Sequence, residues 1–288
     1  MRVARSVGEL DRQPRAVAIG TFDGVHVGHR RILDATVADG RTPTVVTFDP
    51  HPRAVLTGNQ VELITSLERR LELLDALGVV DVLIVEFTPE LSGLEAEGFV
   101  REYLEPIGTE VVLAGPSFRF GRGARGDLRL LELLGLDARP VPLVEGVSST
   151  QIRQLLRAGE VVAAARVLGR PAEVEGTVVS GDARGGTLGF PTANLAVPAN
   201  LLVPAFGIYA GAAEGHRAAI SIGVNPHYGG HERRVEAFLL DFEGDLYGRR
   251  LVVELWARLR EERAFAGEDE LIAQIALDVE AARAAVRP

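Results

Sequence analysis

Two histidines near the start of the chain have a spacing that suits phosphate chemistry. His26 and His29 are three residues apart at the predicted start of a helix, so both rings lie on one helix face. The first amides of a helix lack intrahelical partners, and the helix dipole favours anions there. Gly20, Gly24 and Gly28 allow a ligand to approach the backbone closely. Such a site suits a triphosphate attacked at its α-phosphorus; the alternative is a pair of helix-capping or surface histidines.

A second glycine-rich segment lies in the other half of the chain, from Gly176 to Leu195. Its glycines would let backbone amides meet a phosphate group. Thr192 and Asn194 add two side-chain oxygens, which are the ligands that Mg²⁺ takes. The alternative is an ordinary turn of a β-barrel. Together, the two segments predict two ATP-using sites on one chain.

The elements that must position the first segment alternate between strand and helix up to about residue 170. Apolar runs predict strands over residues 16–19, 44–48, 82–85 and 110–114. Helical patterns cover residues 26–39 and run from a capping box at residues 65–68 to residue 77, and residues 92–95 open another helix. This order predicts an α/β fold with a mainly parallel sheet, helices on both faces, and ligands beyond the carboxyl ends of the strands.

The pattern becomes strand-rich after residue 170. Five segments that are separated by turn residues are predicted as strands: 174–179, 208–213, 217–222, 235–241 and 251–259. Short antiparallel strands with regular turns favour a closed barrel. Residues 268–283 have the apolar spacing of an amphipathic helix, which we expect to pack on that barrel.

The first half resembles the HxGH nucleotidyltransferases, specifically the FMN adenylyltransferase module of bacterial bifunctional riboflavin kinase/FAD synthetases. The resemblance covers residues 16–169 and rests on segments 20–29, 48–52, 115–121 and 148–153, in the family's order. It implies catalytic contacts of His26 and His29 with the ATP phosphates. The implied nucleotide-binding set is Gly20, Phe22, Asp23, Gly24, His26, His29, Ser148, Ser149, Thr150 and Arg153. The implied flavin-binding set is Pro50, His51, Ser117, Phe118 and Phe120.

Residues 176–283 resemble the riboflavin kinase domain, a six-stranded antiparallel barrel with a C-terminal helix. This resemblance implies that Glu236 is the general base and that Thr192 and Asn194 hold Mg²⁺ together with ATP. A carboxylate can take the proton of a ribityl hydroxyl as that hydroxyl attacks the γ-phosphorus. The implied nucleotide-binding set is Gly181, Arg184, Gly189, Pro191, Thr192 and Asn194, and the implied flavin-binding pair is Glu236 and Arg260.

Composition limits the remaining possibilities. A chain of 288 residues suits two domains, which we place at residues 1–169 and 170–288. A net charge of −9 argues against a nucleic-acid partner. The absence of cysteine excludes disulfides and thiolate zinc sites. Neither a signal peptide nor an apolar stretch of ~20 residues is evident, so we expect a cytoplasmic protein without a membrane partner, and self-association stays open.

These observations predict a bifunctional enzyme of flavin-cofactor biosynthesis. The barrel would convert riboflavin and ATP to FMN, and the first domain would convert FMN and ATP to FAD with release of pyrophosphate, both with Mg²⁺. One alternative is a riboflavin kinase with a decayed first domain, because Ser117 stands where the family usually has Asp or Asn. Further alternatives are a flavin-binding protein without turnover and an HxGH transferase that acts on another phosphate ester.

Overall fold

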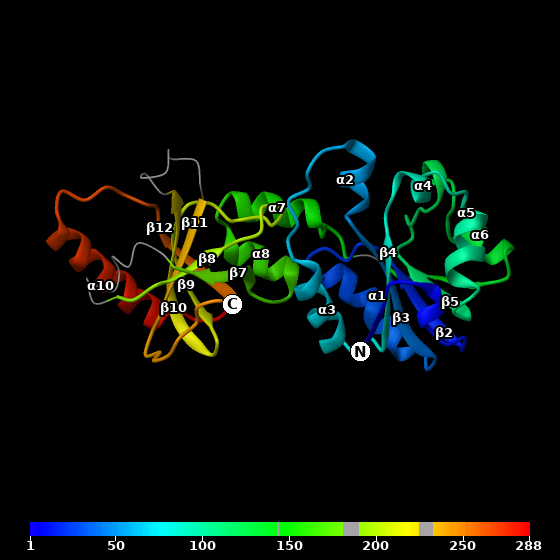
Figure 1. Ribbon diagram of the computed structural model, residues 1–288, viewed down its shortest axis with the longest axis horizontal. Coiled ribbons are helices and arrows are strands. Elements are labelled where there is room, and N and C mark those ends of the chain that lie inside the picture. Colours follow the sequence, from blue (N-terminus) through cyan, green and yellow to red (C-terminus); the bar gives the residue numbers. More distant parts are fainter. Residues whose placement is uncertain (143, 181–189, 225–232) are drawn as a thin grey trace. The chain divides into compact units, whose positions relative to one another are not determined.

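The chain folds into two compact units, residues 1–148 and residues 149–288. The computed structural model describes residues 1–142, 144–180, 190–224 and 233–288. Figure 1 shows the helices and strands of both units.

The first unit is built on a six-stranded sheet in which all neighbouring strands run parallel. The strands are β1 (Arg2–Ala4), β2 (Arg15–Ile19), β3 (Thr42–Asp49), β4 (Asp81–Glu86), β5 (Thr109–Ala114) and β6 (Asp137–Pro140). Their order is β1-β4-β3-β2-β5-β6, so β2 lies between β3 and β5. The predicted parallel sheet is confirmed.

Successive side chains of the sheet point to opposite faces and enter two separate cores. Along β2, Val17 and Ile19 belong to one core, whereas Ala16 and Ala18 belong to the other. Helices α1 and α3 cover the second core, and α5 and α6 cover the first (Figure 1). The helices of this unit are α1 (Val27–Ala38), α2 (Pro52–Thr57), α3 (Leu67–Ala76), α4 (Pro89–Ser92), α5 (Ala96–Phe99) and α6 (Leu128–Leu133), with short turns η1 (Val7–Glu9), η2 (Val100–Leu104) and η3 (Arg122–Ala124).

Two predicted helix starts are wrong by a few residues. The N-cap of α3 is Ser66, whose hydroxyl accepts the amide of Arg69, and not the first residue of the expected capping box. The Thr65 hydroxyl is engaged elsewhere, since it accepts the amide of Gly24. Ser92 ends α4 instead of opening the next helix, because its hydroxyl donates back to the carbonyl of Pro89.

The second unit is a closed antiparallel barrel with strand order β10-β11-β8-β7-β12-β9. The strands are β7 (Ala172–Val179), β8 (Ala193–Ala196), β9 (Gly207–Ala213), β10 (His216–Val224), β11 (Arg233–Leu239) and β12 (Arg250–Arg260). Helix α10 (Glu268–Ala284) packs on β9 and β10, while α7 (Ser149–Arg157) and α8 (Val161–Leu168) precede the barrel. The predicted barrel and its C-terminal helix are confirmed; strand β8 was not among the predicted segments.

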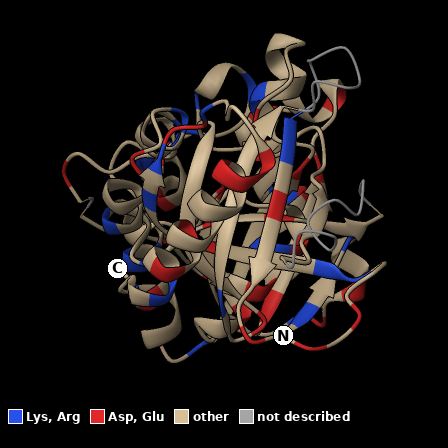
Figure 2. Ribbon diagram, turned by 90° about the vertical axis from the view of Figure 1, so that its left-hand side faces the viewer, with Lys and Arg blue, Asp and Glu red and all other residues tan. Residues whose placement is uncertain are grey.

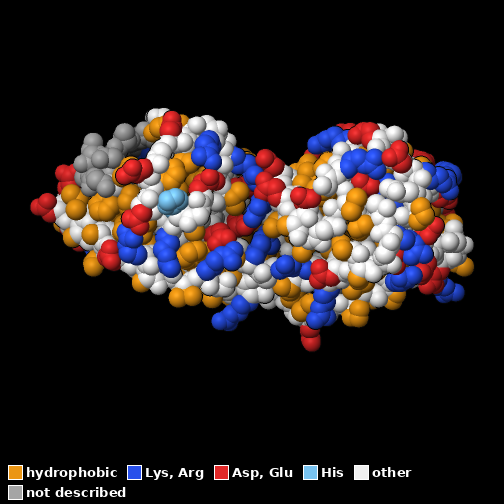
Figure 3. All heavy atoms as spheres, turned by 90° about the horizontal axis from the view of Figure 1, so that it is seen from below, with side chains coloured by type: hydrophobic (Ala, Val, Ile, Leu, Met, Phe, Trp, Pro, Cys, Tyr) orange, Lys and Arg blue, Asp and Glu red, His pale blue; other side chains and the backbone are white. Residues whose placement is uncertain are grey.

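In the two views of Figures 2 and 3, charged residues of both signs are interspersed. Basic and acidic positions follow one another along the barrel strands in Figure 2. On the face shown in Figure 3, basic and acidic side chains are interspersed, and no large area of one sign stands out. Helices in the described part of the chain are all too short or too polar to cross a membrane.

Candidate active sites

Three predicted site segments follow neighbouring strands of the parallel sheet. Residues 20–29 follow β2, residues 50–52 follow β3, and residues 115–121 follow β5. The connection after β2 leads to β3 on one side, whereas the connection after β5 leads to β6 on the other, so the chain connections diverge between the neighbouring strands β2 and β5. Ligands of open parallel sheets bind at such a point, outside the carboxyl ends of the strands. The topology therefore brings these three loops to one edge of the first unit.

The two histidines form a stacked pair at the start of α1. His26 is the N-cap, and its Nδ1 accepts the backbone amide of His29 at 3.2 Å. The ring centroids of His26 and His29 are 3.6 Å apart, and the ring planes differ by 15°. A Cβ at Gly28 would lie 3.2 Å from the His26 ring, so glycine leaves room for this arrangement. In the neutral His26 ring, the proton must then be on Nε2, which can donate to a phosphate oxygen.

His29 is held in its neutral form. Burial lowers the pKa of His29 well below 6.5, and the nearby His26 and Arg70 act in the same direction. Its Nδ1 is buried and has no hydrogen-bond partner among the described residues, and the edge of Phe22 lies against its ring at 5.2 Å. A neutral imidazole at a helix start can approach a polyphosphate as a hydrogen-bond donor without an added positive charge.

The lowered pKa of His29 predicts that acid destabilises the protein. The unfolded histidine binds a proton near pH 6.5, whereas the folded one does so only at lower pH. Stability is therefore complete above about pH 6.5 and falls as the pH decreases below that value. We expect the melting temperature to fall less between about pH 7 and about pH 5.5 in His29→Gln than in the unmodified protein. Equal pH dependence of the two melting temperatures would contradict this prediction.

The buried carboxylate of Asp23 anchors the loop before α1 through hydrogen bonds to the backbone of residues 64 and 65. Asp23 is fully buried, and its Oδ1 accepts the amides of Ile64 at 2.9 Å and Thr65 at 3.2 Å. Gly24 has a φ of +84°, which favours glycine, and its amide donates to the Thr65 hydroxyl. Phe22 is also buried. These contacts show how the loop is held, and the expected contacts of Gly20, Phe22, Asp23 and Gly24 with ATP stay predictions.

Arg70 is a buried cation that is missing from the predicted set. It is 2% exposed, and its Nη1 lies 3.4 Å from the Thr47 hydroxyl and 3.5 Å from the Phe48 carbonyl. Burial lowers the pKa of Arg70, while the charges of two aspartates oppose that shift. The signal in the sequence is its spacing of four residues from Leu74, which places an arginine in the buried stripe of α3.

The predicted flavin-binding residues lie on the loops after β3 and β5. His51 is the N-cap of α2 directly after Pro50, and its Nδ1 accepts the amide of Arg53 at 3.1 Å. Phe118 and Phe120 are stacked with ring centroids 5.5 Å apart, and Phe120 packs on the first core. Ser117 is exposed. The two phenylalanines thus extend an apolar face of the sheet towards the carboxyl edge.

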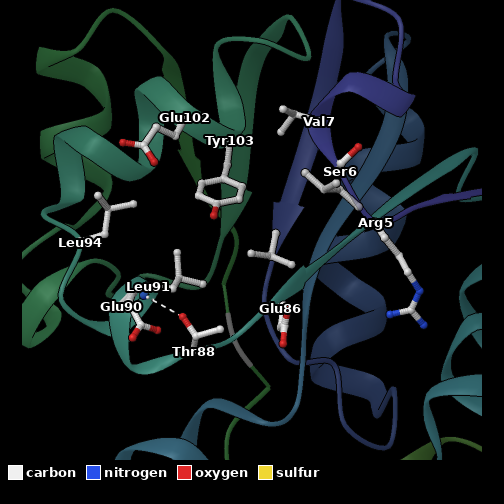
Figure 4. A pocket seen from close by; sticks show the side chains of 12 residues that line it. Arg5, Ser6, Val7, Glu86, Thr88, Glu90, Leu91, Leu94, Glu102 and Tyr103 are labelled. Atoms are coloured by element: carbon white, nitrogen blue, oxygen red, sulfur yellow. Dashed lines mark hydrogen bonds between the residues drawn. The ribbon is translucent and has the colours of Figure 1, made fainter.

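A cavity of about 410 Å³ opens on that same face of the sheet, beside β1 and β4. Figure 4 shows Tyr103 pointing into it, with Glu86, Glu90 and Glu102 around it and the Thr88 hydroxyl accepting the amide of Leu91. Its lining is Arg5, Ser6, Val7, Leu83, Val85, Glu86, Thr88, Glu90, Leu91, Leu94, Glu102 and Tyr103. None of these residues is in a predicted site set.

The fourth predicted segment spans the division between the two units. Ser148 is the last residue of the first unit, and Ser149 begins α7 in the second. Thr150 and Arg153 lie in the first turns of α7. Their expected contacts with the ATP phosphates stay predictions.

The barrel brings together the three residues expected to serve phosphoryl transfer. Asn194 on β8 is the register partner of Glu236 on β11, so their side chains lie on one face of the barrel wall. The Thr192 hydroxyl donates to Oε2 of Glu236 at 3.3 Å. The Glu236 side chain is 26% exposed and open to a ligand. An oxygen-rich cluster with an accessible carboxylate therefore forms from two neighbouring strands.

Two further charged residues surround this cluster and are missing from the predicted set. The Arg234 Nε lies 2.6 Å from Oε1 of Glu236 and donates to Oδ1 of Asn194 at 2.9 Å. Burial and the charge of Glu236 raise the pKa of Glu262, while Arg260 lowers it. Arg234 could have been found from the alternation of β11, since residues two apart on a strand share a face.

Arg260 and Pro191 are the other predicted ligand-binding residues of the barrel that the structure describes. Arg260 ends β12, where its guanidinium donates to both carboxylate oxygens of Asp278 on α10, the shortest contact being 2.7 Å. Pro191 and Thr192 line a pocket of about 180 Å³ whose wall includes Leu246. Gly181, Arg184 and Gly189 lie outside the described residues.

The side chains in the barrel that could bind a metal ion offer oxygen atoms as ligands. Within the described ranges, no group of three or more His, Cys, Asp or Glu side chains is placed to hold a metal ion. The Thr192 hydroxyl, the Asn194 amide oxygen and the Glu236 carboxylate nevertheless lie together. Hard cations such as Mg²⁺ take such oxygen ligands and complete their coordination with water and substrate phosphates. The donor set therefore fits Mg²⁺ that arrives with a nucleotide.

A parallel sheet with an HxGH helix start and a separate closed barrel with a Thr-Asn-Glu cluster define a two-domain transferase of the nucleotide-using class. The FAD synthetase family model matches residues 9–151, and the riboflavin kinase family model matches residues 168–286. The chain belongs to the family of bifunctional riboflavin kinase/FMN adenylyltransferases. The predicted bifunctional enzyme is confirmed, and it is supported over the alternative of a riboflavin kinase with a decayed first domain.

Relatives support this assignment along nearly the whole chain. A bifunctional riboflavin kinase/FMN adenylyltransferase from Listeria monocytogenes is 35% identical, with 94% of this chain and 92% of that protein covered. The Escherichia coli protein of the same description is 36% identical, with 98% and 97% covered. A crystal structure described as a macrolide-efflux protein from Streptococcus pneumoniae has a TM-score of 0.87 and 29% identity, with 98% of both chains covered.

Proposed function

We propose that the chain performs two consecutive reactions at separate sites. The barrel phosphorylates riboflavin with ATP to give FMN and ADP, and the first domain transfers the adenylyl group of a second ATP to FMN, giving FAD and pyrophosphate. The observation that carries the first reaction is the convergence of Thr192, Asn194 and Glu236. The observation that carries the second is the stacked His26–His29 pair at the start of α1.

In the kinase reaction, Glu236 acts as the general base. Its carboxylate takes the proton of the ribityl 5′-hydroxyl as that oxygen attacks the γ-phosphorus, and the bond to the ADP oxygen breaks. Thr192 donates a hydrogen bond to the second carboxylate oxygen and so orients the base. Thr192 and Asn194 would hold Mg²⁺, which neutralises charge on the phosphates when bound. The pocket beside Thr192, with its apolar wall, would take the nucleotide.

In the adenylyltransferase reaction, the protein needs no nucleophile of its own. An oxygen of the FMN phosphate attacks the α-phosphorus of ATP, and pyrophosphate leaves. His26 and His29 donate hydrogen bonds to the phosphate oxygens, where charge develops, from a helix start that favours anions. The flavin would pack on the apolar face that carries Phe118 and Phe120. Ser117 is exposed on that loop, which is consistent with tolerance of the change at this position.

The remaining assignments are also proposals. We place the functional boundary at residues 169/170, whereas the compact units divide at residues 148/149. The ligands are riboflavin, FMN, FAD and ATP, with Mg²⁺. The proposed location is the cytoplasm, where both substrates and ATP are available. Self-association stays open, and the absence of nucleic-acid or membrane partners stays a prediction.

Two parallel reactions test the proposed function. Purified protein is given Mg-ATP with riboflavin in one reaction and with FMN in the other, and the flavins are separated by chromatography. FAD from both reactions is the expected result. FMN that accumulates from riboflavin, without FAD from either reaction, would show that only the barrel is active. No product in either reaction would contradict both activities.

A further inference from the structure

An arginine lies between two acceptor groups in the barrel cluster. Asn194 and Glu236 are opposite each other on β8 and β11. The Nε–H of Arg234 points to both, at 2.9 Å from the Asn194 Oδ1 and 2.6 Å from the Glu236 Oε1. The second oxygen of Glu236 accepts from Thr192 at 3.3 Å. Arg234 is therefore the donor that joins the amide oxygen to the carboxylate.

This contact determines which end of the Asn194 amide faces the cluster. A side-chain amide has an acceptor oxygen and a donor NH₂ of nearly equal size, so its partners determine its orientation. A carboxylate such as Glu236 alone would attract the NH₂ end. With Arg234 present, the oxygen faces the guanidinium, and the Nδ2 lies 3.5 Å from the carbonyl of Thr192.

The orientation matters because Mg²⁺ binds oxygen and not an amide NH₂. An oxygen with two lone pairs can accept from Arg234 with one and leave the other for a cation. We propose that Arg234 is a positioning residue of the kinase site, which turns the Asn194 oxygen towards Mg²⁺ and holds Glu236 at a fixed distance from it. This inference rests on the proposed riboflavin kinase function.

The inference predicts a metal-dependent effect on nucleotide binding. Arg234→Met keeps a long side chain and removes every donor, whereas Arg234→Lys keeps a charged donor. We expect Arg234→Met to bind Mg-ADP about 10- to 100-fold more weakly, because a hydrogen bond to a charged group is lost and the amide can turn. Binding of ADP in the presence of a chelator should change less than about twofold. Arg234→Lys should lie between the two.

Calorimetric titration of the full chain with ADP, with and without Mg²⁺, measures this effect. The chain has two proposed nucleotide sites, and Asn194→Ala shows which binding event belongs to the barrel. Equal weakening with and without Mg²⁺ would mean that Arg234 acts on the phosphates directly and would overturn the inference. Unchanged Mg-ADP binding would overturn it as well.

Kinetics separate positioning from a general loss of structure. Arg234→Met should raise KM for Mg-ATP and lower kcat in FMN formation, leave KM for riboflavin unchanged, and spare FAD formation from FMN. Arg234→Lys should restore part of the lost activity. Parallel increases of both KM values without rescue by lysine would contradict a positioning role. Failure of the proposed function itself is recognised separately, as an absence of FMN formation by the unmodified protein.

Discussion

Replacing Glu236 by glutamine is expected to lower the rate of FMN formation by ~10²–10⁴-fold and to leave FAD formation from supplied FMN unchanged. Glutamine has the same length and can still accept the hydrogen bond of Thr192, but it cannot take the proton of the ribityl hydroxyl. The loss should therefore fall on kcat. Chromatography of the flavins formed from riboflavin and from FMN in parallel measures both rates on one preparation.

The matched control for this change is Glu280→Gln. Glu280 lies on α10 with a side chain that is 74% exposed, and its replacement also removes one negative charge from the barrel unit. Both reactions should continue at the rates of the unmodified protein. Retention of FMN formation in Glu236→Gln would exclude Glu236 as the base. Loss of both reactions in a folded Glu236→Gln protein would show that the two sites are not independent.

Replacing His29 by alanine should have the next largest effect, a decrease of ~10²–10³-fold in FAD formation with FMN formation preserved. The change removes one half of the imidazole stack and, with it, the proposed hydrogen-bond donor to the phosphates. The carbonyl and amide of residue 29 remain, so the amide can still donate to His26 and the helix start is kept. Release of pyrophosphate from ATP in the presence of FMN measures the reaction.

Arg31→Ala is the control on the same helix. Arg31 is exposed in α1, two residues beyond His29, and its removal tests whether any change in this helix disturbs the reaction. FAD formation should be the same in Arg31→Ala as in the unmodified protein. Comparable losses in the two variants would assign the effect to the helix instead of the imidazole.

The architecture of both units was predictable because local patterns and tertiary structure agree. Apolar runs in β2, β3, β4 and β5 produce a sheet that is buried on both faces. The barrel strands were recognisable from turn residues at regular spacing. The site loops then follow from topology, since strands β2, β3 and β5 are neighbours.

What could not be predicted depends on contacts between distant residues. Strand β8 has four residues with little apolar alternation, and pairing with β7 and β11 is what makes it a strand. The N-cap of α3 is not Thr65, because the Thr65 hydroxyl accepts the amide of Gly24, forty-one residues away. Arg70 and Arg234 look like ordinary charged residues in the sequence. Only the fold shows that Arg70 is buried close to His29 and that Arg234 contacts both Asn194 and Glu236.

The shortness of β8 has a consequence for how the barrel opens. β8 is paired to β7 and to β11 at three positions on each side, whereas β10 is paired to β9 and to β11 at seven. The pairing of β8 with its two neighbours, which we call the seam of the barrel, is therefore short. Local unfolding costs least free energy where few backbone hydrogen bonds must break, so we expect β8 to open more readily than β10. Asn194 lies on that seam and Glu236 on its neighbour. If a nucleotide is bound by both residues, as proposed, it should stabilise the pairing of β8, and we expect hydrogen exchange of the β8 amides to slow when Mg-ADP is added.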